Sequence, residues 1–199
     1  ITMALWGGTD ADETKPKFLT DAQKKQVYAT AQGWVAEPGL SGNSNSSAQP
    51  EILVAFKNLA GTDAAPSSGL GLADITEIEF VTTAFDKSDG GNIDVLVRFN
   101  EEVTVNTSGG TPFVVITNDT PARNLQADYL SGSGSNELTF RETIAAANAA
   151  TNAGDVLSIG ANAMALNGGT VKDAGTTDNA TITNSAGIGT AAGTITVTA

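Results

Sequence analysis

Cysteine and histidine are both absent from the 199 residues, and each absence removes a class of chemistry. Without cysteine there is no disulfide framework and no thiolate nucleophile. Without histidine the chain lacks the commonest general base, the usual transition-metal ligand and the Ser–His–Asp mechanism. Catalysis would have to depend on carboxylates, and the sequence therefore predicts a protein that is not an enzyme.

The carboxylates themselves offer little for catalysis. Glu101 and Glu102 are adjacent, so in a strand their side chains face opposite sides of the sheet. Glu77 and Glu79 share a face, but carboxylates on the wet face of a strand usually serve only to solvate it. The glycine-rich runs are not followed by Lys-Ser or Lys-Thr, so a nucleotide-binding loop is not expected.

Positive charge is also scarce, since 10 Lys and Arg stand against 22 Asp and Glu. The formal net charge is −12 and the sequence pI is about 4.1. Such a surface repels phosphate backbones and anionic membranes, so we expect neither nucleic acid nor a membrane as partner. No apolar run approaches the ~18 residues of a spanning helix. Ile1–Trp6 is too short for the apolar region of a signal peptide, and Met3 is interpreted as the natural start.

Charge and composition divide the chain into three parts. Residues 1–60 hold five basic and six acidic residues, whereas residues 61–199 hold five basic and sixteen acidic ones. Between them, Gly61–Gly71 is rich in Gly, Ser, Ala and Pro, a composition typical of linkers. We predict an N-terminal docking segment at 1–60, a linker at 61–73 and a β-sandwich domain at 74–199.

The first sixty residues are interpreted as an irregular arm followed by a small β-meander. Thr20–Gln23 has the residues to cap one helical turn. Val27–Thr30 and Gly33–Ala36 predict a β-hairpin, and Glu51–Phe56 predicts a third strand. Three short strands bury little surface, so we expect this segment to lean on a partner or, alternatively, on the rest of its own chain.

Aromatic residues make up only 6% of the chain, yet five of the eleven lie in its first sixty residues. These candidate interface residues are Trp6, Phe18, Tyr28, Trp34 and Phe56. Aromatic side chains are typical anchors of interfaces, although the same residues could form a small local core. Four lysines between residues 15 and 25 would face an acidic partner or, in the commoner case, solvent.

The rest of the chain has the pattern of many short strands. Ile93, Val95, Val97 and Phe99 lie on one face, with Asp94 and Arg98 on the other, which predicts an antiparallel strand with one wet face. Glycine-rich turns separate this segment from the other expected strands: Ile75–Thr83, Val103–Val105, Pro112–Thr117, Asn124–Leu130, Glu137–Arg141, Val156–Ile159, Met164–Leu166, Gly169–Val171, Ala180–Thr183 and Thr194–Thr198. Only Ile144–Ala150 is expected to be helical. The fold class predicted is an all-β sandwich.

One turn has the oxygen donors that a hard cation prefers. The candidate calcium ligands are Asp86, Ser88, Asp89, Asn92 and Asp94. Their spacing does not fit the EF-hand loop, and an ordinary Asp/Asn/Gly hairpin turn explains the same residues. A second, weaker candidate is formed by Asp173, Asp178 and Asn179, with the same alternative.

Several linked segments resemble a known structural module. Val97–Val105, Ala127–Phe140, Leu157–Ile159 and Leu166–Asp173 are similar, in order and spacing, to bacterial Ig-like repeats. These SwmB-like domains occur in large surface and adhesion proteins. The resemblance implies an Ig-like sandwich over about residues 74–184 and implies no activity, because the module is structural.

The first sixty residues resemble a different group, the small virion structural proteins of tailed marine phages, including cyanophages. The similar segments are Met3–Gly7, Thr14–Leu19, Val27–Thr30, Gly33–Val35 and Pro50–Ala55. This resemblance implies a capsid decoration protein, or another accessory protein of head, neck or tail, on the virion surface. Its expected partners are the major capsid protein or other virion proteins, further copies of itself and, weakly, cell surfaces or glycans. The alternatives are an extracellular bacterial Ig-like adhesion module and a filament-forming subunit.

Overall fold

The structure is a computed structural model that describes residues 15–38, 45, 47–56, 59–60, 71–120, 123–174 and 178–199. It is nearly all β, and thirteen strands in the described residues join through hydrogen-bonded pairs. The strands are β1 (Val27–Thr30), β2 (Gly33–Ala36), β3 (Glu51–Ala55), β4 (Ile75–Phe80), β5 (Phe85–Asp86), β6 (Gly91–Asn106), β7 (Phe113–Asn118), β8 (Leu125–Ser131), β9 (Ser135–Ile144), β10 (Val156–Ser158), β11 (Met164–Ala165), β12 (Thr170–Asp173) and β13 (Thr194–Thr198). Two short helices accompany them, α2 (Asp21–Lys24) and α3 (Ala186–Ala191). The predicted all-β, sandwich-like fold class is confirmed.

Strands β4 to β13, with α3, form a two-layered unit that we call the sandwich. Strands β4, β6 and β9 make one layer, and β7, β10, β13 and β5 make the other. The first half of β8 pairs with β7 and its second half pairs with β9, so β8 carries the sheet from one layer to the other. The layers enclose one large apolar core.

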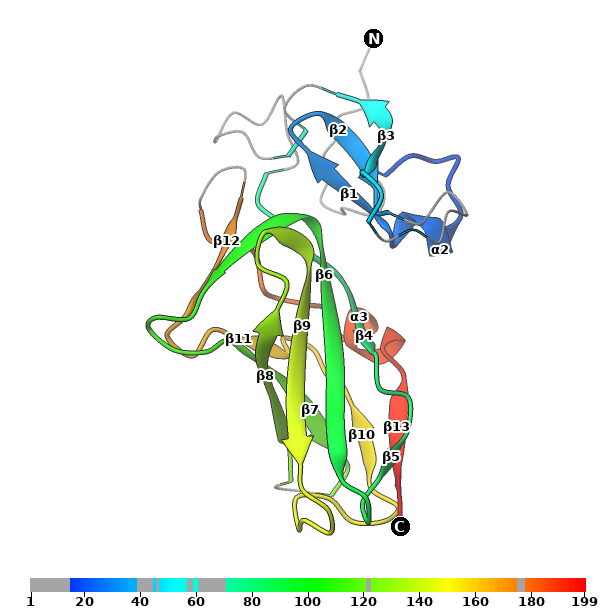
Figure 1. The fold of residues 1–199 in the computed structure, drawn as a ribbon, viewed down its shortest axis with the longest axis vertical. Coiled ribbons are helices and arrows are strands. Elements are labelled where there is room, and N and C mark those ends of the chain that lie inside the picture. Colours follow the sequence, from blue (N-terminus) through cyan, green and yellow to red (C-terminus); the bar gives the residue numbers. More distant parts are fainter. Residues whose placement is uncertain are drawn as a thin grey trace.

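The alternating pattern of β6 explains how that core forms. Ile93, Val95, Val97 and Phe99 are buried on one face, as the period-two pattern predicts. On the opposite face Arg98 and Asp94 meet charged partners from neighbouring strands. With 16 residues β6 runs along much of the long axis of the molecule (Figure 1).

The N-terminal unit consists of α2 and the meander β1–β2–β3. Thr20 and Gln23 form a reciprocal capping box at the start of α2, which confirms the predicted cap. The predicted hairpin and third strand are also confirmed, since β1 pairs with β2 and β2 pairs with β3. This unit lies at one end of the long axis, and the end of β13 lies at the other (Figure 1).

The two units have separate apolar cores. The small core of the N-terminal unit is built around Trp34, Val27 and Leu59 and shares no residue with the core of the sandwich. Ala73 is fully buried in the larger core, so sandwich packing already begins within the expected linker 61–73. Residues 61–70 lie outside the described part of the chain.

Some local expectations are wrong. Ile144–Ala150 is not helical, because Ile144 still pairs with Gly91 in the ladder and the alanines that follow form turns. A segment of this length is also too short to form a stable helix by itself. Val103–Val105 is not a separate strand but part of β6, and Ala180–Thr183 forms only an isolated bridge at Thr181.

Two glycine-rich turns pack backbone against backbone in the sandwich. A Cβ added at Gly168 would lie 2.5 Å from the carbonyl oxygen of Gly109, and one at Gly109 would lie 2.3 Å from that of Gly168. Gly168 also has a positive φ of 85°. Close approach of the two main chains, and not turn geometry alone, therefore requires glycine here.

Gly168→Ala and Gly134→Ala separate these two requirements, because Gly134 has nearly the same φ, 86°, but open space around it. Gly134→Ala should cost ~1–2 kcal/mol, the usual penalty for an L-residue in this conformation. Gly168→Ala should cost a further ~1–3 kcal/mol, because the added methyl overpacks the contact. Urea unfolding of both variants measures the difference. Equal losses of stability would show that the turns separate freely.

Candidate docking surface

The sequence-predicted interface residues fall into two groups in the structure. Tyr28 and Trp34 are buried within the chain, at 7% and 0% exposure, so they are not available to a partner. Phe18 and Phe56 are exposed, at 71% and 38%. Trp6 lies outside the described residues. The chain itself thus covers Tyr28 and Trp34, and only part of the aromatic set can form a docking surface.

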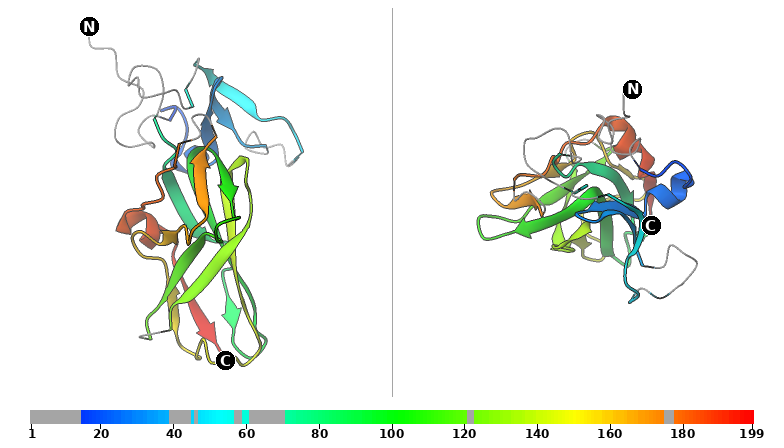
Figure 2. Two further views of the ribbon diagram at one scale, coloured as in Figure 1. Left: turned by 90° about the vertical axis from the view of Figure 1, so that its left-hand side faces the viewer. Right: turned by 90° about the horizontal axis from the view of Figure 1, so that it is seen from above.

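The described part of the N-terminal unit has three exposed large apolar side chains. Ile52 of β3 is 47% exposed, a residue that the aromatic count alone did not identify. Among the strands that the structure describes, β3 is the last of the N-terminal sheet and pairs with β2 alone (Figure 2). An edge strand with exposed apolar side chains is a common site for pairing with another chain. We call Phe18, Ile52 and Phe56 the terminal apolar set.

The sandwich exposes aliphatic side chains and no phenylalanine among its described residues. Its phenylalanines are buried or half-buried, and the exposed large apolar residues that the structure describes there are aliphatic and scattered: Leu72, Val81 and Leu130. Single exposed aliphatic residues are normal on protein surfaces and indicate no binding site. Exposed phenylalanine among the described residues is therefore confined to the N-terminal unit.

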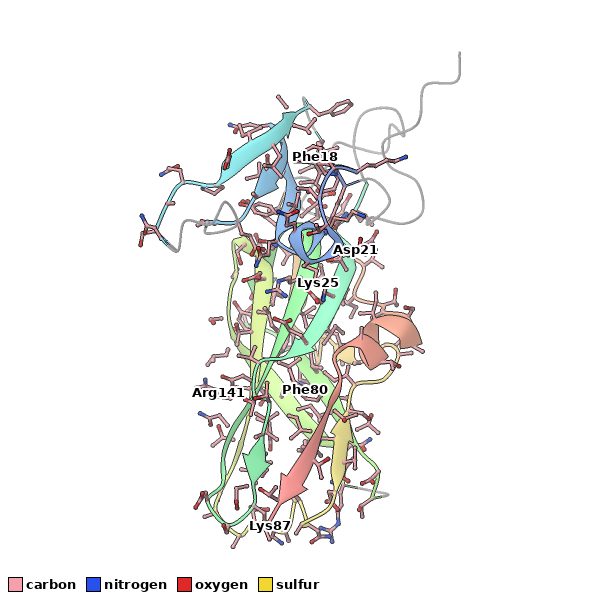
Figure 3. All side chains as sticks on the ribbon, turned by 90° about the vertical axis from the view of Figure 1, so that its right-hand side faces the viewer. Phe18, Asp21, Lys25, Phe80, Lys87 and Arg141 are labelled. Carbon is pink, nitrogen blue, oxygen red and sulfur yellow. The ribbon has the colours of Figure 1, made fainter. Side chains whose placement is uncertain are left out.

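An ionic cluster links the N-terminal unit to the sandwich. Lys25, just after α2, forms an ion pair with Glu77 of β4. Arg98 donates to the same carboxylate at 2.8 Å and also contacts Glu79 at 3.0 Å and Glu137 at 2.6 Å. Burial alone would lower the pKa of Arg98, but Glu137 and Glu77 outweigh it and raise the pKa above its ordinary value. Figure 3 shows Lys25 at the level where the two units meet.

The same cluster explains what the paired glutamates do. Glu77 and Glu79 share a face, as their spacing in the strand predicts, and both bind Arg98. Glu101 is buried whereas Glu102 is half-buried, in keeping with the opposite faces expected for neighbours. The contacts with Arg98 give Glu77 and Glu79 a structural role in holding the strands together.

The candidate calcium turn does not gather its oxygen donors. Asp94 accepts two hydrogen bonds of 2.7 Å from Arg141, which lowers the pKa of its carboxyl. Asp86 accepts from the main chain and the hydroxyl of Ser88, and Asn92 accepts from Thr143. The contacts of Asp86 with Ser88 are those of a turn, whereas Asn92 and Asp94 contact residues that pair with them across β6 and β9.

The second candidate calcium site also consists of ordinary structural contacts. Asp173 is buried and accepts a hydrogen bond of 2.8 Å from the main chain of Ala73, which ties the start of the sandwich to β12. Asn179 bridges to Lys172 of the same hairpin. Within the described residues no group of three or more acidic side chains is placed to hold a metal ion.

In the same part of the chain no helix has the length and apolar character needed to span a membrane.

Comparisons with known proteins add no family. No protein-family model matches the chain, and no curated protein or solved structure matches it significantly. Function is therefore inferred from the residues and from the geometry described above.

Glu37 lies at the junction of the units, where its carboxylate accepts a hydrogen bond of 2.8 Å from Asn136. Burial raises the pKa of Glu37 above its ordinary value of 4.5, and the charge of Glu137 raises it further, while the bond from Asn136 opposes the shift. A carboxyl group whose pKa is higher in the folded state stabilises the fold below its unfolded pKa. That contribution is lost as the pH rises through the folded pKa.

Glu37→Gln should therefore flatten the pH dependence of unfolding, because the amide keeps the acceptor oxygen but cannot ionise. The wild-type protein should lose stability relative to Glu37→Gln as the pH rises from 4.5. Urea unfolding at several pH values between about 4 and 8 measures this difference. Glu51→Gln, at an exposed position of β3, is the matched control and should follow the wild type. A Glu37→Gln curve parallel to that of the wild type would contradict the assignment.

Proposed function

We propose that this protein is a non-enzymatic structural protein of a phage virion, a capsid decoration or cement protein that docks by its N-terminal unit and displays the sandwich outward. The observation that carries the proposal is the placement of the terminal apolar set. Phe18 lies in the unit at one end of the molecule, and Lys87 lies at the opposite end (Figure 3). Exposed aromatic side chains at one end favour an end-on attachment.

The charge distribution supports the same orientation. Residues 61–199 carry a formal charge of −11 and residues 1–60 only −1, as counted above. A nearly neutral end can approach an acidic particle surface with little repulsion, while the acidic sandwich is kept away from it and keeps particles dispersed. The resemblance of the first sixty residues to virion proteins of tailed marine phages agrees with this orientation.

Docking would use two kinds of contact. The outer edge of β3 offers main-chain groups for strand addition, although a bulge at Leu53 and the proline before the strand limit the length of the pairing. Phe18, in the turn before α2, offers an aromatic anchor for a pocket on the partner. The partner that fits is a protein subunit with an exposed strand edge and an apolar pocket.

An extracellular bacterial adhesion module is the second candidate, favoured by the resemblance of about residues 74–184 to Ig-like surface repeats. The two candidate functions differ in where the protein should be found. Mass spectrometry of purified virions from the encoding phage should detect this chain in stoichiometric amounts if the virion proposal holds. Its absence from intact virions would favour the adhesion module.

Phe18→Ser should weaken docking without weakening the fold. The side chain is 71% exposed, so its loss removes little internal packing. Truncation of an aromatic anchor should raise the dissociation constant for particles by about tenfold or more. Co-sedimentation of the full-length variants with particles lacking the protein measures retention. Val81→Ser, at an exposed position of the sandwich, is the control and should be retained like the wild type. Equal retention of both variants would place docking elsewhere.

A further inference from the structure

Strand pairing between the N-terminal unit and the sandwich is limited among the described residues. β1 pairs with β6 at a single position, Ala29 with Glu101, in parallel orientation. The apolar cores on the two sides of this bridge share no residue. Two units that fold around separate cores are expected to move relative to one another unless the contact between them is large and apolar.

Hollows lie on both sides of this connection. One of about 410 Å³ separates α2 from β4 and α3, with Lys24, Lys25, Glu77 and Ile188 in its wall. A smaller one of about 120 Å³ lies between the β1–β2 turn and Ala174, which follows β12. Since protein interiors are normally close-packed, these hollows mark places where the two units are not tightly packed against each other.

Several of the contacts that cross the connection are polar. Lys25 meets Glu77, and Asn136 donates to Glu37. Burial raises the pKa of the buried Tyr28 hydroxyl, and the nearby charges of Glu102 and Glu37 raise it further. Buried glutamates at such a contact are costly unless cations neutralise them, so the orientation of the units depends on those cations.

Among the ion pairs of the described residues, that of Lys25 with Glu77 reaches from the N-terminal unit to the sandwich. Glu77 is only 9% exposed and is already fixed by Arg98, so it offers Lys25 a rigid partner on the sandwich. Lys24, one residue earlier, pairs instead with Asp21 of its own helix, whose side chain is 99% exposed. Two adjacent lysines therefore differ in whether they connect the units.

We infer that the N-terminal unit and the sandwich are two rigid bodies joined by a pivot at Ala29 and Glu101, and that the Lys25–Glu77 ion pair sets their relative orientation. On a particle, such a pivot would let the sandwich tilt over a base that stays docked. The pivot is a property of the isolated chain. Its test is thus independent of the virion proposal, and either can fail while the other holds.

Residual dipolar couplings of the full-length chain test the pivot directly. In Lys25→Met the degree of alignment measured for β1–β3 should fall below that of the sandwich. The couplings within each unit should still fit the structure of that unit. Lys24→Met is the matched control, with the same loss of charge at the adjacent position, and should align like the wild type. Lys25→Arg keeps a positive charge for the ion pair with Glu77, so its two units should have the wild-type relative orientation.

Pulsed electron paramagnetic resonance gives a second measurement. The chain has no cysteine, so Gln32→Cys and Asp89→Cys place spin labels only at exposed sites in the two units. Lys25→Met should broaden the distance distribution between the labels, and Lys24→Met should not. An unchanged distribution and unchanged alignment in Lys25→Met would overturn the inference. So would equal changes in both variants, because a general loss of charge would then explain them.

Discussion

The hydrogen-bonded ladders of β6 are the interaction on which the rest of the structure depends. This strand pairs with β4 and β9 in the body of the sandwich, with β12 further along, and with β1 of the N-terminal unit. Its inward side chains contribute to the core, and Arg98 on its outward face gathers the glutamates at the junction. A single strand thus fixes the core, the ionic cluster and the attachment of the N-terminal unit in one register.

The N-terminal unit is neither an independent domain nor a simple extension of the sandwich. Its three strands bury Trp34 completely, so the meander has a core, but a core of a few residues supports only marginal stability by itself. It gains the remainder from β6 and from the contacts of Lys25 and Glu37 with the sandwich. Such an arrangement leaves its outer end free to bind while its inner end stays attached.

The sequence predicts much of this architecture, because period-two alternation and turn residues are local signals. The β1–β2 hairpin and the capping box at Thr20 follow from residues that are neighbours in the chain. α3 was not predicted, since its AGIGTA sequence contains two glycines and its cap at Ser185 resembles many ordinary loop residues. The alanines after Ile144 led to the opposite error, since a helix was predicted there and none is found. Strand pairing at Ile144 outweighs the helix propensity of so few residues.

The candidate site was less predictable than the fold. Composition pointed to aromatic residues near the N-terminus but could not separate the buried Tyr28 and Trp34 from the exposed Phe18 and Phe56. That distinction depends on which faces of β1 and β2 the rest of the chain covers. The pairing of Lys25 with Glu77 joins residues far apart in the sequence, and no local pattern indicates it.

The contact between the two glycine turns has a consequence for recognising distant relatives of this protein. It joins Gly109 and Gly110 to Gly168 and Gly169 through main-chain atoms, with no room for a side chain on either turn. Core positions can exchange one aliphatic residue for another over evolutionary time, but these four cannot exchange glycine for anything larger without separating the turns. Two glycine pairs at this separation, each in a turn between two strands, therefore form a sequence signature that should persist after overall similarity has disappeared.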